Sequence, residues 1–76
     1  MIEINQELDA SGLNCPLPIL KCKKALNGME SGEVLKVLST DPGSSRDFEA
    51  FCKQTGDELL ENEEDAGTYT FVIRKH

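Results

Sequence analysis

The stretch Ser11-Gly12-Leu13-Asn14-Cys15-Pro16-Leu17-Pro18 marks the point at which the chain enters its first helix. Proline is tolerated in the first helical turn, because the N–H groups there have no partner within the helix. The apolar residues that follow recur at helical spacing, and Asn27-Gly28 is a typical stop signal. The sequence therefore predicts a helix over about residues 15–26, with Cys15 at its start.

This placement gives Cys15 a chemical role. The positive end of a helix dipole lowers the pKa of a thiol and favours the nucleophilic thiolate. Pro18 has no N–H, so Leu17 is the only ordinary backbone donor left for a cap formed by Cys15. If Asn14 caps the helix instead, its side chain can accept from the Leu17 N–H. In both arrangements the backbone binds the sulfur weakly, and we expect an exposed thiol rather than a small buried apolar residue.

The remaining elements follow from hydrophobic patterning. Alternation predicts strands over residues 2–8 and 69–74, an apolar run predicts a central strand over residues 34–38, and residues 58–61 form a weaker candidate. A second helix is expected after Asp41-Pro42-Gly43, where Ser44 and Asp47 resemble a capping box and Gly56 provides the stop. Residues 62–67 are interpreted as a solvated acidic turn.

The predicted order is therefore β-α-β-α-β-β. Right-handed crossovers place both helices on one face of the sheet. We expect a single domain over residues 1–76, an α/β (α+β) two-layer sandwich with a mixed four-stranded sheet. The pattern does not give the strand order. The other face of the sheet should be partly open to a partner or to self-association.

Charge and composition restrict the function. The net charge is −6, and the last 36 residues carry nine carboxylates against four basic residues. This acidic excess argues against direct binding of nucleic acid, which requires neutralisation of phosphates. No apolar run is long enough for a membrane span or a secretory signal, so the cytoplasm is the expected location and no membrane partner is expected.

The other cysteines have structural interpretations. Cys22 follows Cys15 by seven residues on one helix, which separates their Cα atoms by ~10 Å, more than the ~7 Å that a disulfide allows. Cys22 and Cys52 lie on apolar helix stripes and are predicted core residues, although a resolving role for Cys52 stays open. His76, the last residue, is expected to be frayed. No spacing matches a metal-ligand pair, and we predict neither a metal nor a cofactor.

Self-contained hydrolytic machinery is not apparent. The chain has no Ser-His-Asp set, no glycine-rich phosphate loop and no histidine near Cys15 to act as its base. A thiol activated by a helix terminus fits thiol or persulfide exchange, in which the partner supplies the remaining chemistry.

Basic side chains surround this thiol in the sequence. Lys21, Lys23 and Lys24 are expected on the solvated face of the first helix, where they could steer acidic partners towards Cys15. Arg46 belongs to a polar cluster at the start of the second helix. The two helix starts share one edge of the domain if the preceding strands are parallel neighbours, and Arg46 could then shape the electrostatic surroundings of Cys15.

The stretch from Leu8 to Pro18 resembles the signature region of the small sulfur-carrier family called TusA or SirA-like, with its Cys-Pro-x-Pro core complete. Further segments fall where family members carry similar residues: Gly32-Glu33, Thr40-Asp41-Pro42, Arg46-Asp47, Phe51-Cys52, Gly56-Asp57-Glu58-Leu59 and residues 69–74. Cys22 departs from the family pattern, which raises the question of a second reactive thiol.

The resemblance implies a fold similar to the C-terminal domain of translation initiation factor 3. It implies that Cys15 carries sulfur as a persulfide, received from a cysteine desulfurase or a rhodanese-type donor. A TusD- or DsrE-like protein would be the acceptor, in tRNA thiolation, molybdenum-cofactor metabolism or sulfur oxidation.

The resulting hypothesis is a monomeric sulfurtransferase that acts as a persulfide relay on Cys15, with Asn14, Pro16 and Pro18 positioning the thiol. Two alternatives stay open. A thiol–disulfide oxidoreductase would need a second thiol within reach, for which Cys52 is the candidate. A non-enzymatic RNA-binding or regulatory module would act through the open face of the sheet.

Overall fold

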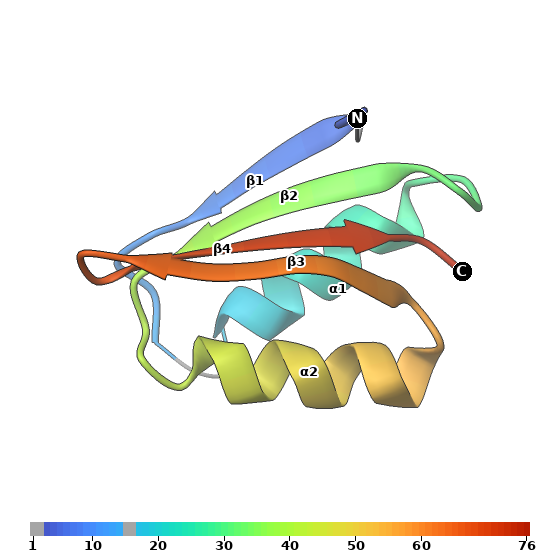
Figure 1. The fold of residues 1–76 in the computed structure, drawn as a ribbon. Helices are drawn as coiled ribbons and strands as arrows, with labels where there is room; N and C mark the ends of the chain where they lie inside the picture. Colours follow the sequence, from blue (N-terminus) through green and yellow to red (C-terminus); the bar gives the residue numbers. More distant parts are fainter. Residues whose placement is uncertain (1–2, 15–16) are drawn as a thin grey trace.

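The computed structural model describes residues 3–14 and 17–76, which form four strands and two helices (Figure 1). In chain order these elements are β1 (Gln6–Ala10), α1 (Leu17–Asn27), β2 (Val34–Ser39), α2 (Ser44–Thr55), β3 (Glu58–Asp65) and β4 (Thr68–Arg74). The predicted order of elements is confirmed. The predicted helix start near residue 15 lies outside the described residues, and α1 as described begins at Leu17.

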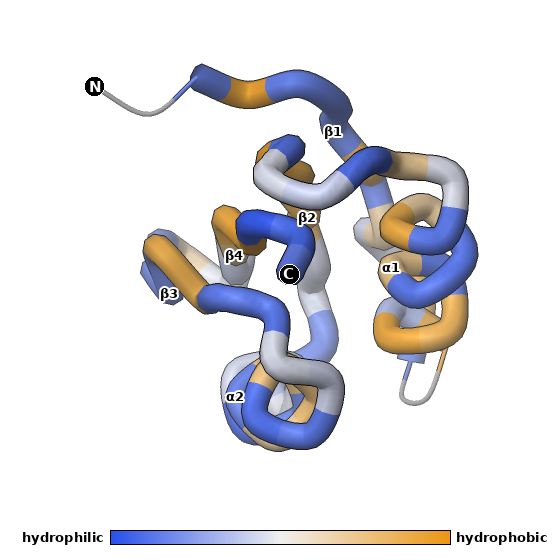
Figure 2. The backbone as a smooth tube through the Cα atoms, turned by 90° about the vertical axis from the view of Figure 1, so that its right-hand side faces the viewer, coloured by the Kyte–Doolittle hydropathy of each residue, from blue (hydrophilic) through white to orange (hydrophobic). Residues whose placement is uncertain are grey.

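The four strands form one mixed sheet in the order β1-β2-β4-β3. β1 and β2 are parallel, whereas β4 is antiparallel to both β2 and β3. Both helices cover the same face of this sheet, as seen from two directions (Figures 1 and 2). The predicted two-layer sandwich is therefore confirmed, and the structure adds the strand order that the sequence pattern did not give.

The hydrophobic core lies between the sheet and the helices. β2 and β4 send alternate side chains towards the helices, as the period of two in a strand requires. At the centre, the rings of Phe48 from α2 and Phe71 from β4 stack with their centroids 4.4 Å apart. Cys22 and Leu26 from α1 belong to the same buried cluster. The core thus joins both helices to the two central strands.

Two predicted strand boundaries are wrong. β1 begins at Gln6 rather than residue 2 and continues to Ala10. β3 continues to Asp65, so most of the predicted acidic turn is strand. Its backbone pairs with β4 as far as Asp65↔Thr68, and this pairing overrides the weak strand propensity of the acidic residues. The real turn is Ala66-Gly67, where both residues have positive φ (51° and 86°), as a two-residue type I′ hairpin turn requires.

The start of α2 also differs from the prediction. Gly43 is the N-cap and no side chain caps the helix, so the predicted capping box of Ser44 and Asp47 is wrong. Ser44 is buried, and its hydroxyl is hydrogen-bonded to the Ser39 hydroxyl with 2.6 Å between the oxygens. This contact diverts the Ser44 side chain from the helix terminus to the end of β2. The predicted stop at Gly56 is confirmed by its left-handed φ of 84° and its N–H bond to the Cys52 carbonyl.

The last residues are held against the domain, so the predicted fraying of His76 is wrong. The His76 N–H donates to the Asp57 carboxylate at 2.8 Å, and the Ser31 hydroxyl donates to the His76 carbonyl at 3.1 Å. The Lys75 ammonium donates to the carbonyls of Leu26 and Met29. It thereby satisfies one carbonyl in the last turn of α1 and one just after the helix, where a cation is favoured.

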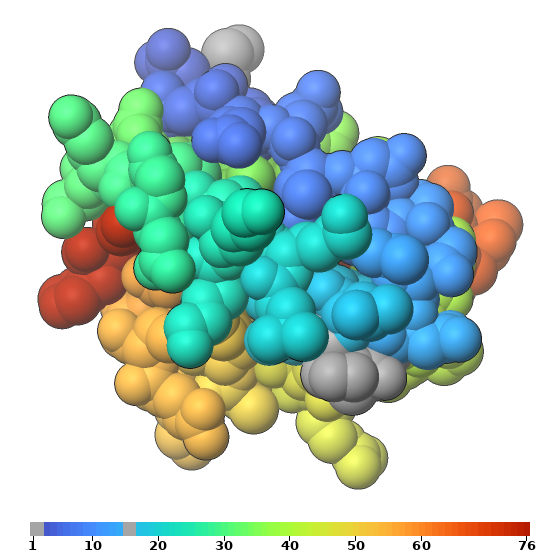
Figure 3. Space-filling view, turned by 180° about the vertical axis from the view of Figure 1, so that it is seen from behind, coloured from blue at the N-terminus to red at the C-terminus, as the bar shows by residue number. Residues whose placement is uncertain are grey.

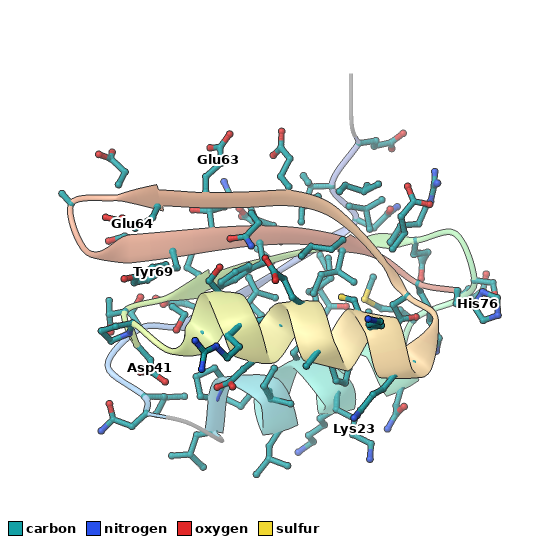
Figure 4. All side chains as sticks on the ribbon, turned by 60° about the horizontal axis from the view of Figure 1, so that its bottom comes forward. Lys23, Asp41, Glu63, Glu64, Tyr69 and His76 are labelled. Atoms are coloured by element: carbon teal, nitrogen blue, oxygen red, sulfur yellow. The ribbon has the colours of Figure 1, made fainter. Side chains whose placement is uncertain are left out.

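Neither α1 nor α2 covers the second face of the sheet (Figure 1), which is partly open as predicted, although Val72 on this face is 2 % exposed. Across the register, Glu7, Lys36, Val72 and Glu61 lie side by side on this face. Glu63 of β3 points away from the helices, whereas Lys23 of α1 points away from the sheet on the opposite side (Figure 4). In the described part of the chain, no helix is long and apolar enough to cross a membrane.

Candidate functional site

The loops that follow β1 and β2 lie beside each other at one edge of the sheet. The two strands are parallel neighbours and end in register, with Ala10 opposite Ser39. The Gly12 N–H donates to the Thr40 hydroxyl at 2.8 Å and joins the loops. Asp41, at the start of the segment leading into α2, lies at this same end of the molecule (Figure 4). The prediction that both helix starts share one edge is therefore confirmed.

The described segment that follows β1 (residues 11–14), which we call the β1–α1 loop, begins with a tight turn. The Leu13 N–H donates to the Ala10 carbonyl at 3.3 Å, and Gly12 has φ = +81°, the combination of a type II turn. The Ser11 N–H donates to the Asp9 carboxylate at 2.9 Å. Hydrogen bonds from the Ser11 side chain and N–H lower the pKa of Asp9, because they favour its ionised carboxylate.

The residues predicted to position the thiol are only partly described by the structure. Cys15 and Pro16 lie outside the described residues. Asn14 is exposed, and its backbone carbonyl accepts the Leu17 N–H at 2.9 Å; the predicted cap through the Asn14 side chain is therefore wrong. Pro18 is fully buried within the first turn of α1. N–H groups in this turn have no acceptor within the helix, so the absence of an N–H in proline costs no helical hydrogen bond.

The two described cysteines are core residues, as predicted. Cys22 is 0 % exposed and Cys52 is 5 % exposed. Burial, with smaller contributions from Cys52 and Asp57, raises the pKa of Cys22 to about 12. Burial, followed by the charge of Asp57, raises the pKa of Cys52 to about 11. Both thiols are therefore protonated at neutral pH and lack the ionised sulfur that a nucleophile or resolving thiol needs.

The outward side of α1 carries residues that the sequence reasoning missed. Leu17 is 47 % exposed and Leu20 is 54 % exposed. Helical spacing aligns them with Lys21 and Lys24, and we call these four residues the α1 outer surface. α1 occupies the middle of one face of the molecule (Figure 3). The available signal was the helical period, which sets both leucines opposite the buried positions Cys22 and Leu26.

The predicted basic residues do not form one cluster. Lys21 and Lys24 line a shallow hollow between α1 and β1, together with Leu8. Lys23 is exposed but is not among the residues of that hollow. Arg46 is exposed in the first turn of α2 and lines a different hollow, whose walls include the carboxylates of Asp41, Asp47 and Glu49. Within residues 3–14 and 17–76, no three side chains of the metal-binding types lie close together.

The fold and the Cys-Pro-x-Pro sequence together define a class of protein. A solved structure of a SirA-like protein from Desulfitobacterium hafniense superposes with a TM-score of 0.78 at 31 % sequence identity, covering 91 % of this chain and 95 % of that one. The chain thus has the SirA-like fold. It also matches the family described as Sulfurtransferase TusA over residues 6–75.

Relatives of known description agree with this match. The chain is 63 % identical over 75 residues to the sulfur carrier protein TusA of Allochromatium vinosum, which covers 99 % of both chains. It is 54 % identical over 70 residues to a putative sulfur carrier protein of Neisseria meningitidis, covering 92 % of this chain and 95 % of the relative. The protein belongs to the TusA sulfurtransferase family.

Proposed function

We propose that this protein is a cytoplasmic sulfur carrier that works as a single domain and relays a persulfide on Cys15. The observation that carries the proposal is the state of the other two thiols. Cys22 and Cys52 are buried and protonated, which leaves Cys15 as the candidate nucleophile among the three cysteines. The identity of 63 % to a sulfur carrier protein supports the same assignment.

The transfer requires no cofactor in its simplest form. The Cys15 thiolate attacks the terminal sulfur of a donor persulfide, a new S–S bond forms on Cys15, and the S–S bond of the donor breaks. The donor leaves as a thiolate, so the reaction has no net oxidation. The same exchange in the opposite direction passes the sulfur to an acceptor thiol. A cysteine desulfurase or a rhodanese is the proposed donor, and a TusD- or DsrE-like protein is the proposed acceptor.

The α1 outer surface is the proposed docking surface for these partners. Exposed leucines beside lysines suit a partner surface with an apolar centre and an acidic rim. No ion pair involves Lys21, Lys23 or Lys24 within the described residues, so their charges are free to meet a partner. Arg46 faces carboxylates of its own chain, and we assign it a smaller part in docking than the lysines.

The buried state of Cys52 argues against the oxidoreductase alternative, because a resolving thiol must reach and attack a disulfide. The acidic open face argues against RNA binding there, because carboxylates repel phosphates.

The test of this proposal is sulfur loading followed by mass spectrometry of the intact protein and its peptides. Incubation with inorganic polysulfide should add the mass of one sulfur atom at Cys15, and reduction with dithiothreitol should remove it. The Cys15→Ser variant should stay unloaded, whereas the Cys52→Ser variant should load normally. Loading of the Cys15→Ser variant would refute the assignment of the carrier thiol.

A further inference from the structure

The hydrogen bond between Gly12 and Thr40 has a property that the other contacts of the β1–α1 loop lack. The Ser11 and Leu13 N–H groups donate to Asp9 and Ala10, which are only two and three positions earlier in the chain. Gly12, by contrast, donates to a residue 28 positions away. Among the described residues, this is the one hydrogen bond that joins residues 11–14 to another strand or loop.

Thr40 is well suited to hold this loop, because the chain on both sides of it is fixed. Ser39 is fully buried at the end of β2, and its hydroxyl is bonded to that of Ser44. The Asp41 N–H donates to the same Ser39 hydroxyl at 3.2 Å. The exposed Thr40 therefore projects its hydroxyl from a rigid corner between β2 and α2.

The segment between Gly12 and the cysteine is short. Cys15 follows Gly12 by three residues, a length of chain that spans at most about 10 Å when fully extended. Leu13, between them, packs against the core with part of its side chain. A shift of the Gly12 peptide is therefore passed on to the residues that lead into Cys15. Transfer reactions are sensitive to displacements of this kind, since they require aligned reacting atoms.

We propose that Thr40 is a positioning residue for sulfur transfer: its hydroxyl anchors the Gly12 N–H and so fixes the β1–α1 loop that presents Cys15. The inference rests on the proposed carrier role of Cys15 and adds a residue from the opposite loop to the site. Thr40 has no chemical part in the exchange. Its contribution is to limit the range of positions that the loop samples.

The variant Thr40→Val tests this inference, because valine keeps the shape of threonine and removes the acceptor oxygen. We expect faster hydrogen exchange at the Gly12 amide and an about tenfold slower transfer from a persulfide-bearing cysteine desulfurase. The thermal midpoint should stay within about 2 °C of the wild type, since the bond is exposed. Thr40→Ser, which restores the hydroxyl, should return both the exchange rate and the transfer rate to wild-type values.

A matched control comes from Ser31→Ala, which removes an exposed hydroxyl bonded to a distant residue at the other end of the sheet. This variant should transfer sulfur at the wild-type rate. Wild-type transfer by Thr40→Val, or slow transfer by Thr40→Ser, would overturn the inference. Alkylation of Cys15 by iodoacetamide reports on the loop without any sulfur. If the wild type fails to load but Thr40→Val still changes this alkylation rate, the carrier role fails and the anchoring role stands.

Discussion

The two helices cover the same face of the sheet but present different residues to water. Each supplies one buried cysteine to the core, Cys22 from α1 and Cys52 from α2. The exposed positions of α2 are polar, charged or small: Arg46, Glu49, Ala50, Lys53, Gln54 and Thr55. α1 instead exposes Leu17 and Leu20 about half-way, beside lysines. The core-facing sides are thus equivalent, and the outward sides are not.

This difference separates residues that stabilise the fold from residues that are available to contact a partner. Folding alone explains α2, whose large apolar side chains lie in or against the core and whose exposed residues are polar, charged or small. Folding does not explain two exposed leucines one helical turn apart in α1, because they add little to the core and expose apolar area. We therefore expect substitutions on the core side of either helix to change stability. Substitutions on the outward side should change transfer more in α1 than in α2.

The largest expected effect is on the core side. Replacing Cys22 by serine should lower the free energy of unfolding by about 1–3 kcal/mol, because a hydroxyl is buried among apolar side chains. Cys52→Ser should have a similar effect, and both variants should retain most of their sulfur transfer. Chemical denaturation measures the first quantity and a loading assay the second. A Cys22→Ser protein with wild-type stability and no transfer would reverse the roles of core and site.

Alkaline pH should lower the free energy of unfolding, because it ionises the two buried thiols on the core sides of the helices. The folded-state pKa of Cys22, about 12, and that of Cys52, about 11, lie above the ordinary value of a thiol. Their stabilising contribution is thus complete below about pH 8.5 and is lost as the pH rises through the folded-state values, at no more than about 1.4 kcal/mol per pH unit for each thiol. Denaturant midpoints measured between about pH 8 and pH 10 should fall, and less so in Cys22→Ala. If the midpoints of the wild type and of Cys22→Ala fell equally steeply with pH, this account would be contradicted.

On the outward side, the double substitution Leu17→Ser with Leu20→Ser should slow transfer from a cysteine desulfurase about tenfold, through loss of apolar contact with the partner. Loading by inorganic polysulfide should be unchanged, because this small donor needs no docking surface. The matched control is Ala50→Ser on α2, which should leave both rates unchanged. If the leucine variant slows both donors equally, the leucines support the loop rather than the docking.

The smallest expected effect concerns charge. Neutralising Lys21 and Lys24 together to glutamine should lower the second-order transfer rate a few-fold, about two- to fivefold at low ionic strength, because rim charges act mainly on association. Added salt should abolish the difference through screening. Lys53→Gln, on the exposed side of α2, is the control and should change the rate less. A salt-independent loss would argue for a structural role of these lysines.

Much of this architecture was readable from the sequence, because local signals and burial agreed. The proline-flanked helix start, the two glycine stops and the alternation at residues 69–74 predicted the element order, and right-handed crossovers then placed both helices on one face. Cys22 and Cys52 were assigned to the core by helical period alone. At these positions local propensity and tertiary packing favour the same structure.

The errors occurred where distant contacts decide local structure. Residues 62–65 have the composition of a turn, but pairing with β4 makes them strand. Ser44 looks like a cap, but its hydroxyl is bonded to Ser39 across the β2–α2 corner. His76 is the last residue, which predicts fraying, but Asp57 and Ser31 from distant parts of the chain are hydrogen-bonded to its backbone. The exposure of Leu17 and Leu20 was missed for a different reason, since the sequence analysis used the apolar residues of this helix only to place the helix and assigned no outward apolar surface.

The position of β3 at the rim of the sheet has a consequence for solubility. β3 is an edge strand of eight residues, and its outer side offers unpaired backbone groups to any other extended chain. Such edge strands promote aggregation. Here Glu61, Glu63 and Asp65 alternate on one side of that strand with Glu64 on the other, so an approaching second copy meets like charge on either side. Acidification or charge removal along this edge should therefore favour edge-to-edge, fibre-like assembly.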